Sequence, residues 1–137
     1  MRDNGFVILV TGVLCDAQER ILLLKRSKTN KSFQEYWQLP EGKMEFGEQP
    51  RETLARELDE ELGLKLKDAE SFDVCSKTFS VAGKRLHLLR IIMLTHYKGK
   101  ILLSKEHSEY KWVNLAQARK MPKLVPGIKE VLTLLNL

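Results

Sequence analysis

Acidic residues crowd one short segment of the chain, between positions 41 and 61: Glu41, Glu45, Glu48, Glu52, Glu57, Asp59, Glu60 and Glu61. Only Lys43, Arg51 and Arg56 are basic there, so the segment carries a net charge of −5. The whole chain carries +5, and the part outside this segment therefore carries +10. Carboxylate oxygens are the ligands that hard divalent cations prefer, and a basic surface attracts polyanions. This contrast indicates metal-assisted chemistry on phosphates.

A helix over Pro50–Leu62 is predicted to position several of these acids. Proline suits the first turn of a helix, and Gly63 stands where a C-terminal cap belongs. Leucines at intervals of four residues give the helix one apolar stripe: Leu54, Leu58 and Leu62. We expect this stripe to face the core.

Three glutamates form a second stripe beside the leucines: Glu57, Glu60 and Glu61. Glu52 and Asp59 point to the other flank and are expected to face solvent. Like charges three and four residues apart on a helix repel one another, more strongly within a cleft. A cation such as Mg²⁺, which binds carboxylate oxygens together with water and substrate phosphates, would offset that repulsion.

The rest of the chain predicts strands and a second helix. Phe6–Cys15 and Ile21–Lys25 are apolar runs around a polar turn, and they indicate one hairpin. Phe72–Val81 and Arg85–Tyr97, joined through Gly83, indicate another. Shorter elements complete the chain: an extended Tyr36–Pro40, a strand at Tyr110–Leu115, a helical turn at Leu115–Lys120 and a helix at Pro126–Leu135. The order β-β-β-α-β-β-β-α predicts an α+β fold built as an α/β/α sandwich.

Length and composition favour one domain spanning residues 1–137. The longest apolar runs fall short of the roughly 18–20 residues of a membrane helix, and no secretion signal is recognisable. Cys15 and Cys75 are expected to be reduced thiols of a cytoplasmic protein without a membrane partner. Lys and Arg are scattered along the chain, which suits either nucleic-acid binding or a solvated surface with a phosphate-binding cleft.

The acidic segment resembles the Nudix box, whose pattern is G-x5-E-x7-R-E-U-x-E-E-x-G-U with U aliphatic. Every fixed position of that pattern is matched within residues 42–64: Gly42, Glu48, Arg56, Glu57, Leu58, Glu60, Glu61, Gly63 and Leu64. The predicted strand order on both sides also fits the family. The resemblance implies a Nudix-type α/β/α sandwich with a mixed central sheet. It also implies hydrolysis of a nucleoside diphosphate linked to a further group, with Mg²⁺ or Mn²⁺ as cofactor.

The resemblance assigns roles to the residues of the box. Glu60 and Glu61 correspond to the principal metal ligands of the family. Glu57 corresponds to a further ligand or to the base that deprotonates the attacking water. Arg56 would orient that glutamate, and Glu48 would hold water at the metal or brace the loop.

Residues outside the box are further candidates. Glu106 lies where many relatives carry an extra loop carboxylate, so it is a candidate metal ligand or base, and Glu109 is the competing choice. Arg26 and Lys43 are candidate phosphate contacts. Trp112 could stack on a nucleobase, although a tryptophan in a small domain more often packs in the core or at its rim.

Glu41 marks a departure from the family, in which a second glycine usually precedes the box glycine. The residue at this position often gives its backbone carbonyl to the metal, and Glu41 can still do so. Its carboxylate is expected either to face solvent, the preferred interpretation, or to influence the choice of substrate.

The function expected from these residues is cleavage of a nucleoside triphosphate, ordinary or modified, to monophosphate and pyrophosphate, as in the MutT-like members of the family. The first alternative is a dinucleoside polyphosphate hydrolase or an RNA 5′ pyrophosphohydrolase, in which case RNA would be a partner through its 5′ end. The second is a Nudix-fold module that senses a nucleotide without cleaving it. Homodimers are common in the family.

Overall fold

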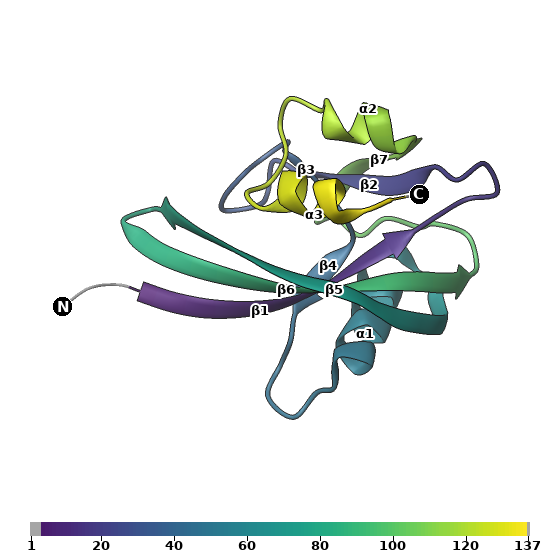
Figure 1. Ribbon diagram of the computed structural model, residues 1–137, viewed down its shortest axis with the longest axis horizontal. Coiled ribbons are helices and arrows are strands. Elements are labelled where there is room, and N and C mark those ends of the chain that lie inside the picture. Colours follow the sequence, from purple (N-terminus) through teal and green to yellow (C-terminus); the bar gives the residue numbers. More distant parts are fainter. Residues whose placement is uncertain (1–3, 137) are drawn as a thin grey trace.

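Two β-sheets and the helices around them make up the protein, which was analysed as a computed structural model describing residues 4–136 (Figure 1). The larger sheet has four strands in the spatial order β4 (Glu41–Lys43), β1 (Asn4–Leu14), β6 (Lys84–Lys98) and β5 (Lys65–Val81). The smaller has three, in the order β3 (Trp37–Gln38), β2 (Ile21–Arg26) and β7 (His107–Val113). Strand β1 runs parallel to β6 and antiparallel to β4, so the larger sheet is mixed. The predicted α+β class with a mixed sheet is confirmed.

Helices cover both faces of the larger sheet (Figure 1). Helix α1 (Pro50–Leu62) has the predicted bounds, and its three stripe leucines are completely buried against one face. Helix α3 (Ile128–Leu134) packs on the other face, and the short α2 (Leu115–Arg119) lies beside it. The sandwich arises because the sheet has two apolar faces, each of which must be removed from water.

Helix α1 is fixed at both ends by local interactions. At the start, the backbone N–H of Gln49 donates to the Glu52 side chain at 2.8 Å, and Pro50 occupies the first helical position. Gly63 ends the helix in the left-handed conformation, with φ 65°. These caps fix where the helix begins and ends, and burial of its leucine stripe sets the direction in which its glutamates point.

The first predicted hairpin is wrong in its pairing. Strands β1 and β2 lie in different sheets and are joined only by an isolated bridge between Cys15 and Ile21. The reason is that residues 10–14 of β1 are buried on both faces, with Val10 packed towards α1 and Val13 towards α3, so the strand runs inside the larger sheet between β4 and β6. The second hairpin is confirmed, with β5 beginning earlier than predicted.

Strand β4 is an element that the sequence analysis missed. Gly42 pairs with Val10 and Lys43 with Leu9 at the edge of the larger sheet. No helix within the described part of the chain is long and apolar enough to cross a membrane.

Candidate active site

An open cleft with a volume of about 650 Å³ runs from α1 across one face of the larger sheet. Acidic side chains line it near α1 and β4: Glu41, Glu57, Glu61 and Glu106. Apolar side chains line the part over β1, β5 and β6: Val7, Leu9, Phe79, Val81, Leu86 and Leu88. Phe33, from the loop after β2, meets Phe79 edge to face with ring centres 5.8 Å apart. The cleft therefore joins a charged region to an apolar and aromatic one.

Glu57 lies at the charged end with a side chain that is 16% exposed. Burial and the neighbouring charges of Glu61 and Glu60 together raise the pKa of Glu57 to about 7, against the opposing effect of Arg56. The backbone of Gly42 lies directly against this side chain, since a β-carbon at position 42 would sit 2.0 Å from Glu57 Cγ. Gly42 is therefore required for the close approach of β4 to α1.

Arg56 forms hydrogen bonds to three other residues of the acidic segment. Its guanidinium donates to both carboxylate oxygens of Glu48, to Glu57 Oε1 at 3.0 Å and to the carbonyl of Lys43. The hydrogen bond from Arg56 lowers the pKa of Glu48 to about 2, with help from the backbone N–H of Glu45. Since Glu48 also accepts from Thr53 and does not line the cleft, its contacts are those of a loop brace.

Glu61 faces the cleft from the last turn of α1. Ser104 Oγ donates to Glu61 Oε2 at 2.8 Å, and His107 Nδ1 lies 3.5 Å from the same oxygen. Burial raises the pKa of Glu61, and Glu106 raises it further. Burial also lowers the pKa of His107 to about 4, so its imidazole is neutral near pH 7. His107 Nδ1 has no hydrogen-bond partner among residues 4–136.

Glu60 does not join the other two glutamates in the cleft. Its side chain is 55% exposed, and one carboxylate oxygen lies 3.7 Å from Arg56 Nη1. On the helix Glu60 is rotated away from Glu57, further from the apolar stripe than Glu61 is. The structure thus brings Glu57 and Glu61 together and leaves Glu60 at the rim. The two acids assigned to the other flank are solvent-facing as predicted: Glu52 caps the helix and Asp59 pairs with Lys65.

The donor groups at this end of the cleft suit a hard divalent cation. Glu57 and Glu61 supply carboxylate oxygens, and burial, with the charge of acidic neighbours, disfavours their ionised forms and raises both pKa values. A bound cation would stabilise those ionised forms. No three His, Cys, Asp or Glu side chains within residues 4–136 already converge as a metal-binding group. Mg²⁺ commonly binds through one or two carboxylates, with water and substrate phosphates completing its shell, so two convergent glutamates fit it.

Glu106 and Glu109 were competing candidates, and the structure places them differently. Glu106 lines the cleft, whereas Glu109 lies outside it with one carboxylate oxygen 3.9 Å from Lys25 Nζ. The backbone carbonyl of Glu106 accepts from Ser27 N–H and from the amide of Asn30, which ties its loop to the loop after β2. Of these two candidates, Glu106 is therefore the one that the fold holds at the cleft.

Two of the predicted phosphate contacts also line the cleft. Arg26 is half-buried and donates to Ser32 O, Gln38 Oε1 and Asn30 Oδ1, none of which carries a charge. Lys43 is exposed at the mouth. Both cations lie where an anionic ligand in the cleft would meet them.

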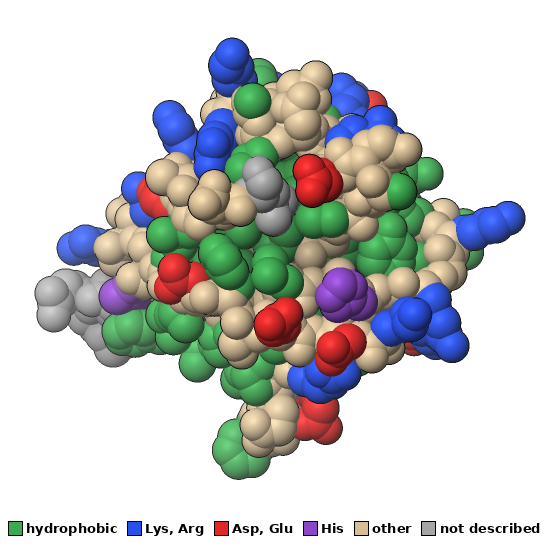
Figure 2. Space-filling model, turned by 45° about the vertical axis from the view of Figure 1, so that its right-hand side comes forward, with side chains coloured by type: hydrophobic (Ala, Val, Ile, Leu, Met, Phe, Trp, Pro, Cys, Tyr) green, Lys and Arg blue, Asp and Glu red, His purple; other side chains and the backbone are tan. Residues whose placement is uncertain are grey.

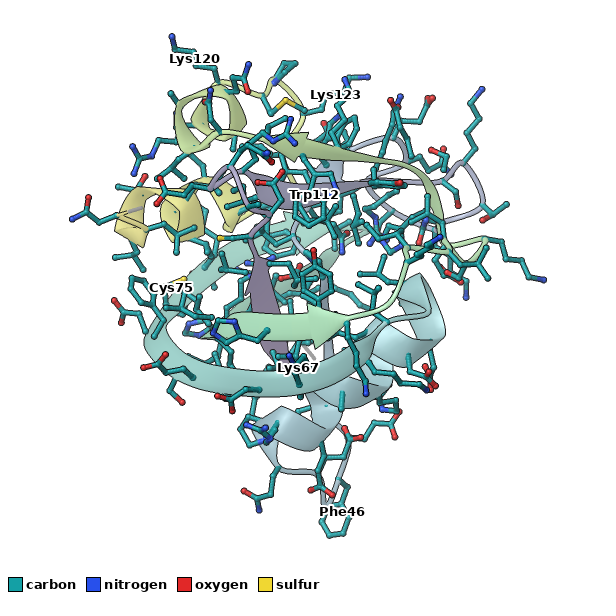
Figure 3. All side chains as sticks on the ribbon, turned by 90° about the vertical axis from the view of Figure 1, so that its right-hand side faces the viewer. Phe46, Lys67, Cys75, Trp112, Lys120 and Lys123 are labelled. Atoms are coloured by element: carbon teal, nitrogen blue, oxygen red, sulfur yellow. The ribbon has the colours of Figure 1, made fainter. Side chains whose placement is uncertain are left out.

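Trp112, expected to contact the substrate, is not among the residues that line the cleft. Its ring stacks on that of Tyr97, with centres 6.3 Å apart, and it packs against the core on the α1 side of the smaller sheet. Figure 3 shows it lying on β7 over the middle of the molecule, far from Phe46, which projects from the turn before α1. The Trp112 indole therefore packs at the rim of the core.

The preferred expectation that the Glu41 carboxylate faces solvent is wrong. Its side chain is 6% exposed and is held by the guanidinium of Arg90, which is 1% exposed. Thr11 Oγ1 donates to the same carboxylate at 2.8 Å. The sequence signal was a single arginine within the apolar run of β6, whose partner lies 49 residues away.

The basic residues do not gather into one patch on the face nearest the viewer in Figure 2. Most of their side chains project from its margin, while hydrophobic side chains and single acids occupy the middle (Figure 2). On this face the basic excess therefore forms a dispersed surface charge.

The family model described as "NUDIX domain" matches residues 6–135. An RNA pyrophosphohydrolase of Blochmanniella pennsylvanica is 39% identical over 67 residues, which are 48% of this chain and 39% of that protein. An 8-oxo-dGTP diphosphatase of Proteus vulgaris is 27% identical over 105 residues, which are 77% of this chain and 90% of that protein.

Solved structures agree. A MutT protein from Methanosarcina mazei Go1 superposes with a TM-score of 0.74 at 27% identity, covering 91% of this chain and 88% of that one. Nudix hydrolases generally use divalent metal ions, in keeping with the donor groups at the charged end of the cleft. The match of the family model over nearly the whole described chain, with the complete box in place, shows that this protein belongs to the Nudix family.

Proposed function

We propose that this protein is a Mg²⁺-dependent pyrophosphohydrolase that cleaves a nucleoside triphosphate, ordinary or oxidised, to the monophosphate and pyrophosphate. Mn²⁺ is the second candidate cofactor. The proposal rests on one observation: a single cleft has a carboxylate-rich end and an apolar, aromatic end. A nucleotide has the same polarity, with a polyphosphate at one end and a flat base at the other. A volume of about 650 Å³ lies in the range of small-molecule sites.

Cation binding and bracing of the loop are assigned to different residues. Glu57 and Glu61 would hold the cation within the cleft, Glu60 would add a ligand from its rim, and the backbone carbonyl of Glu41 would add another. When bound, the cation would neutralise phosphate oxygens and acidify water. Glu48 is assigned to bracing the loop through Arg56.

Proton transfer has two candidate acceptors. Glu57 would accept the proton of the attacking water if it is not occupied as a ligand, and its pKa of about 7 suits a general base near neutral pH. Glu106, held at the cleft by Ser27 and Asn30, is the other candidate base. Arg56 would orient Glu57, while Arg26 and Lys43 would contact phosphates.

A substrate panel tests this function. Wild type and the variants E57Q, E60Q and E106Q would be compared on nucleoside triphosphates, 8-oxo-dGTP, diadenosine polyphosphates and 5′-triphosphorylated RNA with Mg²⁺. The proposal predicts turnover of a triphosphate that falls by about 10²-fold or more in E57Q and E60Q. The matched control is D59N, on the opposite flank of α1, which should keep full activity. A wild type that binds nucleotide but cleaves none of these compounds would identify a sensor instead.

An RNA 5′ end is the second candidate substrate. The ammonium groups of Lys25 and Lys111 lie 5.9 and 5.1 Å from the centre of the Trp37 ring, so one cation from β2, the strand that carries Arg26, and one from β7 lie near the same indole. Several relatives carry the name RNA pyrophosphohydrolase, although this chain spans only about 40% of their length. This alternative predicts strong inhibition by single-stranded RNA that weakens steeply with salt. A cytoplasmic location, homodimer formation and the extent of the domain, residues 1–137, stay predictions.

A further inference from the structure

Arg90 and Glu41 form a buried ion pair at the floor of the cleft. Arg90 Nε donates to Glu41 Oε1 at 2.9 Å and Arg90 Nη2 donates to Glu41 Oε2 at 3.1 Å, a bidentate arrangement. Thr11 adds a third hydrogen bond to Oε1. The pair therefore links three neighbouring strands: β4, β1 and β6.

The Arg90 side chain is confined on its other side by Gly127. A β-carbon at position 127 would lie 2.1 Å from Arg90 Nη1, so the start of α3 approaches the guanidinium closely. Only a planar, forked cation presents two parallel N–H groups to a carboxylate, and lysine cannot replace it in this geometry. The surroundings thus fix both the position and the orientation of the Glu41 carboxylate.

Glu41 is next in sequence to Gly42, whose backbone lies against the Glu57 side chain. Gly42 follows Glu41 and leaves no room for a β-carbon against Glu57. Any displacement of Glu41 would therefore move the backbone that touches Glu57. The same anchor directs the Glu41 carboxylate towards Arg90, and thereby keeps a further negative group from turning towards Glu57 and Glu61.

We propose that Arg90 is a positioning residue for the cation site. Its two hydrogen bonds to the Glu41 carboxylate fix the backbone of residues 41 and 42 against Glu57. The same hydrogen bonds keep that carboxylate from binding the cation. This inference rests on the proposed function, because it concerns the geometry in which Glu57, Glu61 and the Glu41 carbonyl receive the ion.

The test measures Mn²⁺ binding without substrate, from the electron paramagnetic resonance signal of free Mn²⁺. The variants are E41A, R90M, the double variant E41A/R90M and the conservative R90K. K77M is the matched control, because Lys77 lies on the neighbouring strand β5 and pairs with Glu130 at 2.8 Å outside the cleft. Circular dichroism and thermal unfolding show which variants are folded, and R90K keeps the test available if the larger changes unfold the protein.

The positioning role predicts that E41A and R90M each weaken Mn²⁺ binding by about tenfold or more, and that the double variant is no worse than either single one. R90K should behave like R90M, since it keeps the charge and loses the fork, while K77M should stay within about twofold of wild type. Opposite changes, weaker in E41A and tighter in R90M, would show that only charge matters and would overturn the proposal. Unchanged Mn²⁺ affinity in folded variants with lowered melting temperatures would also overturn it.

The proposed function has its own control in the same experiment. Wild type should bind Mn²⁺, and E57Q and E61Q should bind it at least about tenfold more weakly. A wild type that bound no Mn²⁺ would contradict the proposed cation site and this inference together. A wild type that bound Mn²⁺ normally, with E41A and R90K unchanged, would contradict the inference alone.

Discussion

Gly42 and Glu57 lie so close together that the glycine has no room for a β-carbon beside the glutamate side chain. A β-carbon at position 42 would lie 2.0 Å from Cγ and 2.3 Å from Oε1 of Glu57. Such distances do not occur between real atoms, so any side chain here would force Glu57 out of its place. The glycine is needed for space beside the acid.

We therefore expect G42A to remove most activity while the protein stays folded. The new methyl group would rotate Glu57 away from the cleft, and misplacement of a reacting group by about 1 Å can cost about 10²-fold in rate. The turnover number and circular dichroism would be measured together. G5A is the matched control, because a β-carbon at position 5 meets only Leu86 Cδ2, at an ordinary 3.5 Å. Full activity in G42A would contradict the role given to this contact.

Arg56 should be irreplaceable by lysine. Its guanidinium serves Glu48, Glu57 and the Lys43 carbonyl at once, and an ammonium group cannot reach all three. We expect R56K to lower kcat by at least about tenfold. R51K, on the same helix, alters an exposed pair with Asp68 and should change kcat by less than twofold. Equal effects of the two substitutions would argue against an orienting role for Arg56.

The raised pKa of Glu57 makes the stability of the metal-free protein depend on pH. Between its ordinary value of 4.5 and about 7, the folded protein keeps a proton on Glu57 that the unfolded chain has released. The free energy of unfolding should therefore fall as pH rises through this window. Urea unfolding with EDTA at pH 5, 6 and 7 would measure it, and the fall should be smaller in E57Q. A wild type and E57Q with the same pH dependence would refute the assignment.

Mg²⁺ should reverse this loss of stability. A divalent cation binds the charged form of Glu57 in the folded state only, so 10 mM Mg²⁺ should raise the free energy of unfolding more at pH 7.5 than at pH 5.5. The difference should be smaller in E57Q, in which Glu61 alone of the two convergent glutamates still titrates. A stabilisation by Mg²⁺ that did not depend on pH would place the ion elsewhere.

The apolar end of the cleft should control KM. Phe79 lines it and meets Phe33, and stacking of a base on an aromatic ring contributes about 1–3 kcal/mol. F79S is therefore expected to raise KM for a nucleoside triphosphate about tenfold with little change in kcat. F72S removes an exposed phenylalanine from the same strand outside the cleft and should leave KM unchanged. W112F should also leave it unchanged, whereas a raised KM in W112F would restore the stacking role expected from the sequence.

Short-range patterns explain how much of this arrangement the sequence could predict. The leucine stripe, Pro50 and Gly63 define α1 with its observed bounds, because caps and periodicity act within a few residues. The same periodicity places Glu57 and Glu61 together beside that stripe. It does not reveal that Glu60 is exposed, since this depends on how far the cleft extends around the helix.

Long-range pairing explains what the sequence could not predict. Strand β4 has three residues, including a glycine, and it exists only because β1 offers it an edge. The partner of Arg90 lies on another strand of the sheet, and a lone arginine in an apolar run indicates burial without naming the acid that offsets it. The pairing of β1 with β6 similarly depends on the burial of both its faces.

Phosphorus NMR of the reaction mixture identifies which phosphoric anhydride bond the protein cleaves. Wild-type protein would be incubated with dGTP or 8-oxo-dGTP and Mg²⁺, and the phosphorus-containing products would be identified as they form. The expected products are the monophosphate and inorganic pyrophosphate in equal amounts, with no product formed by E57Q over the same time. Release of the diphosphate and inorganic phosphate, or the same product formation by E57Q as by wild type, would contradict the proposed function.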